Sequence, residues 1–280
     1  MINIKCNMNN RINNILIAIP AYNTAACLRK IIECLPLENL LVVNDGSTDE
    51  TASLLIEMAV THLTHDKNLG LSEAIRSAEK YCEDHGYEGI LFLDSDGQHP
   101  PEMYHLFLAQ LESCGFVIGD RFSNLENIPS QKVHSNVLAS LLIADVTGVF
   151  LRDVSCGYRG YRISTQNKSD TALLEGYADI FYRLIDHLRT GTIISRVPIP
   201  AIYDISLPLA TKSSELLGLC DAVLAVEPHN KYACTISECV KERKEFELCI
   251  GGLSFSTKYI SSINQYVIKT DHLAAIKLYG

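Results

Sequence analysis

The chain has 280 residues, of which 47% are hydrophobic and 20% are charged, and its net charge at pH 7 is −9. This length and composition suffice for one substantial core, or for a main domain with a small appendage. The acidic balance argues against sequence-independent nucleic-acid binding, because such binding needs a basic face. A local basic pocket for phosphate groups remains compatible with it.

The cysteines and the N-terminus bear on the cellular compartment. Ten cysteines occur, with no CxxC pair, so a zinc ribbon or a thioredoxin-like motif is not indicated. We expect reduced thiols in a cytoplasmic protein, and a disulfide framework is the alternative. The Asn-rich N-terminus lacks the apolar run of a secretory signal, and no stretch reaches the roughly 20 apolar residues of a membrane span. We therefore expect a protein that is soluble or peripheral at the inner membrane surface.

Short apolar runs alternate with segments of helical spacing in the first part of the chain. The predicted strands are residues 15–19, 40–43, 62–65, 89–93 and 116–118. The predicted helices are residues 25–35, a helix capped by Ser47 or Thr48, and residues 72–85 and 101–112. This alternation predicts an α/β fold, with a mostly parallel twisted sheet covered by helices on both faces.

The rest of the chain is more helical and then changes character near Ser213. We expect helices at residues 131–150, 177–189 and 215–226, and strands at residues 192–199, 246–250 and 266–268. The apolar face over Asn136 to Leu151 is broader than a core stripe needs. It either lies among lipid headgroups or packs inside the domain, and the acidic net charge favours packing inside. We predict a catalytic domain of residues 1–212 and a C-terminal extension of residues 213–280 without a recognisable motif.

Polar segments follow the predicted strands where each strand ends. They are Pro20-Ala-Tyr-Asn23, Asn44-Asp-Gly-Ser47, Asn68-Leu-Gly70 and Asp94-Ser-Asp-Gly-Gln98. Ligands of parallel α/β sheets bind at the carboxyl ends of the strands. These segments can therefore converge on one rim and form a single site.

The acidic segment is the strongest of these signals. Asp94 and Asp96 can direct two carboxylates at one hard cation, and Gln98 can add a carbonyl oxygen. Such oxygen ligands suit Mg²⁺ or Mn²⁺, and open coordination positions would accept substrate phosphates. A DxD pattern alone is more often a solvated acidic turn, but here it follows a buried strand among other polar loops.

Other candidates are individually ambiguous. Asp45 can accept hydrogen bonds from a nucleobase or ribose, but Asn-Asp-Gly-Ser is also good turn chemistry, and Asn68 has the same ambiguity. Arg121, Arg159 and Arg162 are candidate phosphate binders, because a guanidinium group matches phosphate oxygens. Asp153 lies upstream of two of these arginines, where it would hold Arg159 or serve the reaction.

At these segments the chain resembles family 2 of the nucleotide-sugar glycosyltransferases, particularly its dolichol-phosphate mannosyltransferase and polyprenyl-phosphate glycosyltransferase branch. The segments that carry the resemblance are IAIPAYN, VVNDGSTDET, HDKNLGLSEAI, LFLDSDGQHPPE, GDRF, DVSCGYRGYR and VPIPAIY. They occur in the order typical of the family. The resemblance implies an A-type glycosyltransferase fold and transfer with inversion.

The resemblance also implies roles for individual residues. It places Pro20, Tyr22 and Asn23 at the nucleotide, together with Asp45, Gly46, Ser47 and Asn68. It assigns Asp94, Asp96 and Gln98 to the metal and Arg121 to the donor diphosphate. Arg159 is a further candidate for the donor phosphates from its residue type alone. The catalytic candidates are Asp96, Arg121 and Asp153.

The sequence differs from the family pattern at several positions that are expected to contact the donor. Thr24 stands where an acidic residue is common, and Asn68-Leu-Gly-Leu-Ser72 lacks the usual basic residue. The arginine expected after the VPI strand is missing, and Lys212 is a possible substitute. These changes leave the donor sugar and base open.

The expected activity is metal-dependent transfer of a sugar from a nucleoside diphosphate sugar to a polyprenyl phosphate. The alternatives are a soluble enzyme that glycosylates a glycan hydroxyl, a sugar nucleotidyltransferase, and a non-catalytic nucleotide-sugar-binding scaffold. A hydroxyl acceptor would need a general base, for which Asp153 and Asp179 are the candidates. The expected partners are thus the donor, a polyprenyl phosphate or glycan acceptor, and peripheral contact with a membrane, but no nucleic acid.

Overall fold

The computed structural model describes residues 14–126, 128–165, 174–203 and 210–279. The chain divides into two compact units, and both are assembled from separated stretches of sequence. The first unit comprises residues 1–119, 156–166 and 192–200, and the second comprises residues 120–155, 167–191 and 201–280.

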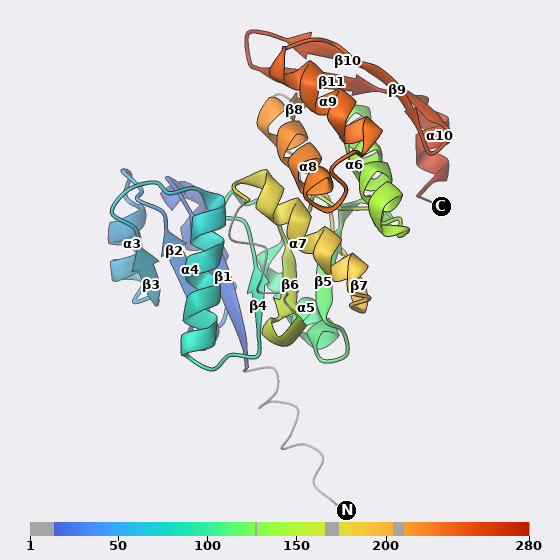
Figure 1. The fold of residues 1–280 in the computed structure, drawn as a ribbon. Helices are drawn as coiled ribbons and strands as arrows, with labels where there is room; N and C mark the ends of the chain where they lie inside the picture. Colours follow the sequence, from blue (N-terminus) through green and yellow to red (C-terminus); the bar gives the residue numbers. More distant parts are fainter. Residues whose placement is uncertain (1–13, 127, 166–173, 204–209, 280) are drawn as a thin grey trace, which may run out of the picture. The chain divides into compact units, whose positions relative to one another are not determined.

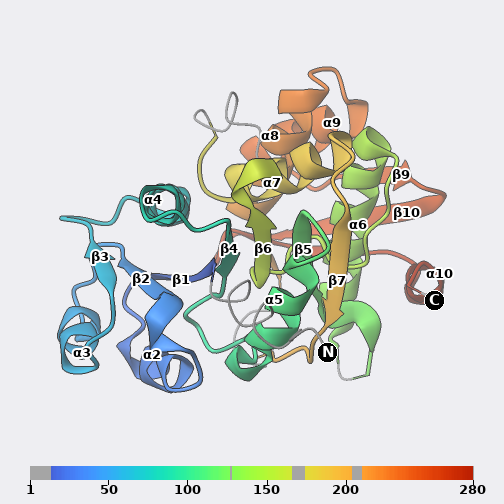
Figure 2. The same ribbon diagram turned by 90° about the horizontal axis from the view of Figure 1, so that it is seen from below.

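The first unit is built on a seven-stranded sheet with the strand order β3-β2-β1-β4-β6-β5-β7. Its strands are β1 (Ile15–Ala21), β2 (Leu40–Asn44), β3 (His62–Thr64), β4 (Gly89–Phe92), β5 (Phe116–Asp120), β6 (Arg159–Arg162) and β7 (Ile194–Pro198). Its helices are α2 (Ala25–Ile32), α3 (Thr51–Glu57), α4 (Leu71–Asp84) and α5 (Tyr104–Leu111). In Figure 2, α4 covers one face of the sheet, and α2, α3 and α5 cover the other. The predicted α/β architecture is confirmed.

Strand register brings the polar segments to one edge of this sheet. Strands β1, β2, β3 and β4 pair in parallel, and Ala21 at the end of β1 lies opposite Asn44 at the end of β2. Strand β6 runs antiparallel between β4 and β5, with Arg159 opposite Phe92. The turn that leads into β6 therefore enters at the edge where β4 ends.

The helix expected to be capped by Ser47 or Thr48 begins later. Its first residue is Thr51 and its N-cap residue is Glu50, which makes no side-chain capping bond. The predicted cap is therefore wrong. Asp49 supplies the local bond instead, because its Oδ1 accepts from the Thr51 amide at 3.0 Å.

The second unit combines helices with a four-stranded sheet of order β8-β11-β10-β9 (Figure 1). Its helices are α6 (Ser130–Thr147), α7 (Tyr177–Arg189), α8 (Ser213–Val226), α9 (Lys231–Lys241) and α10 (His272–Lys277). Its strands are β8 (Thr211–Lys212), β9 (Glu247–Ile250), β10 (Leu253–Ile260) and β11 (Gln265–Lys269). The β9–β10, β10–β11 and β8–β11 pairs are antiparallel.

Helix α6 lies inside the second unit. All residues from Asn136 to Ile143 are buried, and α7, α8, α10, β9 and β11 pack around the helix. Internal packing of the apolar face is thus confirmed for residues 136–143, and the lipid-facing alternative is wrong for that stretch, whereas Val146 and Phe150 are half-buried and Val149 is exposed. No helix among the described residues has the length and apolar character that a membrane span requires.

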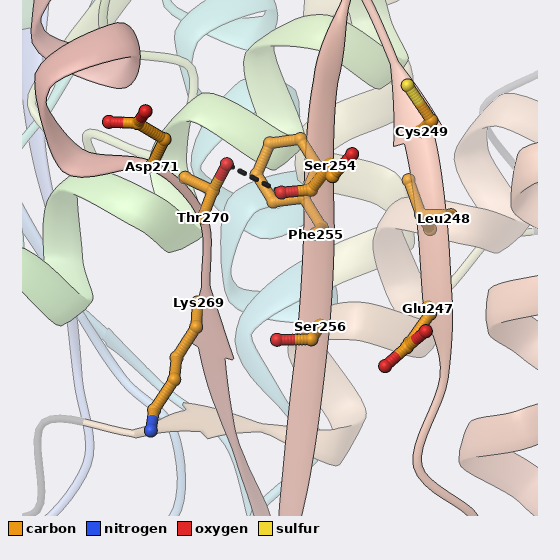
Figure 3. Close-up of a pocket in the computed structure, with 9 residues that line it drawn as sticks. All are labelled: Glu247, Leu248, Cys249, Ser254, Phe255, Ser256, Lys269, Thr270 and Asp271. Carbon is orange, nitrogen blue, oxygen red and sulfur yellow. Dashed lines mark hydrogen bonds between the residues drawn. The ribbon is translucent and has the colours of Figure 1, made fainter.

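An open groove of about 610 Å³ lies over the second sheet (Figure 3). One side is formed by Glu247 and Cys249 of β9, and the other by Lys269 and Asp271. The Thr270 hydroxyl donates to the carbonyl oxygen of Ser254 at 2.8 Å and joins the end of β11 to β10. None of the predicted site residues lines this groove.

The nine cysteines within the described parts of the chain are all free thiols. Burial raises the pKa of Cys82 and of Cys220 to about 12, so these two thiols are held in the protonated form. The expectation of free thiols is confirmed for these nine residues, of which Cys82, Cys114, Cys156 and Cys220 are buried and Cys34 and Cys249 are exposed.

Candidate active site

The loops after β1 and β2 are bonded to each other through Asn23. Its Oδ1 accepts from the amides of Thr48 at 2.8 Å and Asp49 at 3.3 Å, and its own amide donates to Ser47 Oγ at 3.0 Å. Asn23 has φ +54°, a left-handed conformation that asparagine tolerates. The preceding Tyr22 is 45% exposed, which leaves its ring accessible to a planar ligand.

Asp45 is buried and fastens the next loop to the end of β2. Its Oδ1 accepts from His65 Nδ1 at 2.7 Å and from the Leu69 amide at 2.9 Å, and its Oδ2 accepts from the Gly70 amide at 2.8 Å. His65 is also bonded to Ser77 through Nε2 at 2.9 Å, and its side chain is 12% exposed. A structural role for Asp45 is therefore established, and its role in binding a nucleotide stays a prediction.

Gly46 allows the two loops to touch. Its φ is +66°, and a Cβ atom at this position would overlap the backbone of Lys67 and Asn68. Only glycine meets both requirements. Asp45, Gly46, Ser47 and Asn68 are thus brought together, and Asn68 is exposed beside them.

The acidic residues lie on a tight loop after β4. The Asp94 side chain is 42% exposed, and Asp96 is exposed, with its Oδ1 accepting from the Gln98 amide at 2.9 Å. Asp94 lies against Gly157, where a Cβ atom would overlap its carboxylate. The antiparallel entry of β6 therefore supplies a position without a side chain that accommodates Asp94.

His99 packs behind Asp94 and was not singled out from the sequence. It is 3% exposed, its Nδ1 is 3.7 Å from Asp94 Oδ2, and its Nε2 is 3.7 Å from Cys156 Sγ. The nitrogen–oxygen distance exceeds hydrogen-bonding range, so the ring limits the carboxylate by packing. The sequence signal that could have identified His99 is its position directly after Gln98, a predicted metal ligand.

The acidic loop carries the kind of donor atoms that a hard divalent cation prefers. Asp94, Asp96 and Gln98 offer only oxygen donors, and Gly157 leaves room for the first carboxylate. In the parts of the chain that the structure describes, no group of three or more His, Cys, Asp or Glu side chains is arranged to hold a metal. Two carboxylates and an amide would leave coordination positions for phosphate oxygens, which is the usual arrangement for Mg²⁺.

Two crossed ion pairs in the second unit join the residues after β5 to the residues before β6. Arg121 binds Asp153 with both ends of its guanidinium group, Nε to Oδ2 at 2.7 Å and a terminal nitrogen to Oδ1 at 2.9 Å. Asp120 is bound by Arg152 at 2.7 Å. Asp153 and Asp120 are each 1% exposed, and an arginine charge beside each one compensates for its burial.

Asp153 therefore holds Arg121, and the expectation that it holds Arg159 is wrong. A terminal nitrogen of Arg121 also donates to Ser155 Oγ at 2.9 Å, and the Ser155 amide donates to Asp153 at 3.2 Å. The Arg121 guanidinium group is thereby fixed in orientation. The fork formed by Nε and this terminal nitrogen is occupied by Asp153 and Ser155, so these contacts fix the position of the Arg121 charge.

In the second unit, burial and nearby charges shift the pKa values of Lys132 and Glu215. Burial lowers the pKa of Lys132, and the charges of Arg121 and Lys212 lower it further, while Glu215 opposes them. Burial raises the pKa of Glu215, although Lys132, Arg121 and Lys212 lower it. Burial thus favours the protonated form of the Glu215 carboxyl group, and the charges of Lys132, Arg121 and Lys212 oppose that effect. Lys132 and Glu215 were missed, because nothing in their local sequence distinguishes them.

The remaining predicted residues lie apart from these groups or are engaged elsewhere. Arg159 is 6% exposed and donates from Nε to the Cys156 carbonyl at 2.7 Å. Arg162 pairs with Gly89, the first residue of β4, and binds Glu88 at 3.0 Å. That position is at the opposite edge of the sheet, so the expectation for Arg162 is wrong.

Asp179, one of the two candidate general bases, is fully buried in α7. Its Oδ2 accepts from Arg183 Nε at 3.1 Å, one helical turn further along. Both carboxylates considered as bases are therefore paired with arginines.

Comparisons with known proteins identify a family for this chain. The model of Glycosyl transferase family 2 matches residues 16–168. The chain is 29% identical over 203 residues to polyprenol monophosphomannose synthase from Mycolicibacterium smegmatis, covering 66% of this chain and 76% of that one. It is also 29% identical over 202 residues to undecaprenyl-phosphate mannosyltransferase from Micrococcus luteus, covering 66% of this chain and 82% of that one.

A solved structure shares the fold. Glucosyl-3-phosphoglycerate synthase from Mycobacterium tuberculosis, in complex with Mn²⁺, uridine diphosphate and phosphoglyceric acid, aligns with a TM-score of 0.58 and 20% identity. The alignment covers 75% of this chain and 78% of that chain.

Proposed function

The chain belongs to glycosyl transferase family 2 and is a glycosyltransferase, and on that basis we propose that it transfers a sugar, with inversion, from a nucleoside diphosphate sugar to a polyprenyl phosphate. The observation that carries the proposal is the pairing of both candidate bases. Asp153 is bound by Arg121 and Asp179 by Arg183. A phosphate acceptor is already ionised and needs no base. The names of the two mannosyltransferase relatives point to the same class of acceptor.

On the donor side, the nucleotide binds at the loops after β1 and β2. Tyr22 contacts the base, and Pro20, Asn23, Gly46, Ser47 and Asn68 shape the rim. Asp45 contributes by holding the Leu69–Gly70 amides in place. Arg159 acts indirectly, by fixing the turn at Cys156 that precedes Gly157.

At the donor diphosphate, Asp94, Asp96 and Gln98 would hold Mg²⁺ or Mn²⁺. When bound there, the ion would supply Lewis-acid stabilisation of the leaving diphosphate. The support for this assignment is the all-oxygen donor set on one tight loop and the space that Gly157 leaves for Asp94.

On the acceptor side, Arg121, Lys132 and Lys212 provide cationic groups for phosphate. Arg121 is oriented by Asp153 and Ser155, which occupy one side of its guanidinium group, so its charge is positioned without further ordering. Lys212 takes the place of the arginine that the family pattern leads one to expect.

Glu215 supports a second candidate function, the glycosylation of a hydroxyl group. Burial raises the pKa of this carboxyl group, which is the change that a general base requires. In that case Glu215, rather than Asp153 or Asp179, would accept the proton of the hydroxyl.

The test is a donor panel with the full-length chain. GDP-sugars and UDP-sugars are incubated with Mg²⁺ or Mn²⁺ and either polyprenyl phosphate in vesicles or a soluble glycan, and nucleotide and product are identified by mass spectrometry. We expect nucleoside diphosphate and a glycosylated polyprenyl phosphate. Release of pyrophosphate would indicate nucleotidyl transfer instead.

A variant separates the two acceptors. Glu215→Gln should retain transfer to polyprenyl phosphate, because that acceptor needs no base. Transfer to a glycan that is abolished by Glu215→Gln, with no lipid product from the wild type, would contradict the proposal and establish the hydroxyl acceptor.

A further inference from the structure

Tyr279, which follows helix α10, reaches into the interior of the second unit. It is 5% exposed, although it lies just beyond the short helix α10. Its hydroxyl oxygen accepts from Asn136 Nδ2 at 2.9 Å, and its carbonyl oxygen accepts from Arg152 at 3.3 Å. Its ring stacks on Phe122 with centroids 5.4 Å apart and an interplanar angle of 22°.

These partners flank the Arg121–Asp153 ion pair in the sequence. Phe122 follows Arg121, and Arg152 precedes Asp153. Asn136 bonds the backbone on both sides of Asp153, because its Nδ2 donates to the Arg152 carbonyl and its Oδ1 accepts from the Val154 amide at 3.4 Å. Tyr279 therefore contacts Phe122, which is next to Arg121, and Arg152, which is next to Asp153. It also contacts Asn136, whose side chain bonds the backbone on both sides of Asp153.

Helix α10, which precedes Tyr279, is itself anchored to α6. Asp271 caps α10 by accepting from the amides of Leu273 at 3.0 Å and Ala274 at 3.1 Å. His272 Nδ1 lies 3.2 Å from Nε2 of the buried His134. Just before the helix, the Ile268 amide donates to Gln131 Oε1 at 3.1 Å. The extension is thus bonded to α6 at two places before Tyr279, through Ile268 and His272.

We propose that Tyr279 is a positioning residue for Arg121, and that the C-terminal extension completes the phosphate-binding part of the active site. The orientation of Arg121 depends on Asp153, the backbone around Asp153 depends on Asn136 and Arg152, and both of these side chains are bonded to Tyr279. The catalytic part of this inference rests on the proposed function. The structural part does not.

The test compares Tyr279→Phe with a matched change in the same extension, Tyr259→Phe. Both remove one hydroxyl group, and the Tyr259 hydroxyl donates to Asn264 Oδ1 at 2.9 Å, on the exposed side of the sheet. A second control is Leu273→Ala, which alters a residue of α10 that is 72% exposed. Phenylalanine preserves the ring packing at both positions, so each variant is expected to fold.

The first readout is amide hydrogen exchange, which needs no catalysis. The amides of Arg121 and Ser155 donate to Asp153, and that of Val154 donates to Asn136. Tyr279→Phe leaves the buried Asn136 amide group without one acceptor, so these amides should exchange roughly 5- to 30-fold faster. Neither control should change them. Unchanged exchange in Tyr279→Phe would overturn the inference, whatever the enzyme's acceptor is.

The second readout separates positioning from a loss of folded protein. Tyr279→Phe should lower kcat/KM for polyprenyl phosphate by roughly 5- to 30-fold through a higher KM for the acceptor, with unchanged affinity for nucleoside diphosphate. A lower kcat with unchanged KM values would indicate a smaller active fraction and would overturn the catalytic role. If the wild type makes no product from polyprenyl phosphate, the proposed function fails, and the exchange comparison still decides the position of Tyr279.

Discussion

Gly157 lies directly against the Asp94 carboxylate, so that a methyl group at Gly157 would overlap it. The overlapping atoms belong to the end of a side chain that can rotate away at little cost in stability. A substitution here should therefore move a proposed metal ligand and leave the fold intact.

Gly157→Ala should reduce transfer at least about tenfold, since displacement of a reacting group by about 1 Å is enough for large losses. Its melting temperature should stay within a few degrees of that of the wild type. Gly160→Ala is the matched control. A Cβ atom there would lie 2.7 Å from the Ile90 carbonyl oxygen, and the backbone cannot rotate away. The control should lose about 1–3 kcal/mol of unfolding free energy in urea titrations. Wild-type activity in Gly157→Ala at limiting Mn²⁺ would contradict the assignment of Asp94.

Asp96→Ala tests the second carboxylate of the acidic loop. Asp96 is exposed, and the bond that it makes is to the Gln98 amide within its own loop. Unfolding free energy should therefore change by no more than about 0.5 kcal/mol. Turnover should fall by about 100-fold or more, because water cannot replace the charge of the lost ligand. Asp84→Ala, which removes an exposed carboxylate on α4, is the control. Equal turnover of Asp96→Ala and wild type under saturating Mn²⁺ would exclude Asp96 as a ligand.

Asp45→Asn separates loop fastening from nucleotide binding. Both carboxylate oxygens of Asp45 accept hydrogen bonds, from His65, Leu69 and Gly70. In the variant an NH₂ group replaces one of these oxygens and would face an N–H donor without forming a hydrogen bond. We expect a loss of about 1–3 kcal/mol in unfolding free energy. Calorimetry should show a comparable loss in affinity for nucleoside diphosphate. A loss of stability with unchanged nucleotide affinity would restrict Asp45 to its structural role.

His187 makes stability depend on pH. It is 2% exposed in α7, and burial together with the charge of Arg183 lowers its pKa from 6.5 to about 4. Below pH 6.5 the unfolded chain binds a proton here and the folded chain does not, so stability is full above pH 6.5 and falls as the pH drops to about 4. The loss is on the order of 3 kcal/mol.

Urea titrations at several pH values between 7 and 4 measure this effect. His187→Gln should flatten the pH dependence, because glutamine does not titrate. The control is His105→Gln, which replaces an exposed histidine near the start of α5. It should leave the pH dependence of stability as it is in the wild type. A pH dependence that is the same in all three proteins would show that other groups cause it.

The parts of the fold that could be predicted from the sequence are those with a local signal. Apolar runs ended by proline or polar residues predicted the strands β1, β2 and β4, and helical spacing predicted α7 with its observed bounds, Tyr177–Arg189. Strand β6 was missed, because Arg159-Gly-Tyr-Arg162 has charged residues at both ends and no alternation. It becomes a strand through pairing with β4 and β5, which are distant in sequence.

The candidate site divides in the same way. Asp94, Asp96 and Asn23 could be predicted, because they follow apolar strands directly. The pairing of Asp153 with Arg121 could not be predicted, since 32 residues separate the two. Lys132 and Tyr279 gave no signal, because their importance comes from burial among distant side chains, and sequence spacing carries no information about that.

Each compact unit is assembled from three separate stretches of the chain, so the two units cannot be separated by a single cut. The second unit takes its residues from stretches 120–155, 167–191 and 201–280, so a single cut at residue 212 would remove α8 to α10 from the helices α6 and α7 that they pack against. The buried residues of α6 would then be exposed to water. A fragment ending at residue 212 should therefore aggregate when it is expressed alone, and the extension should not be separable by fusion or exchange with another protein. Deletions and chimeras would have to respect all three stretches.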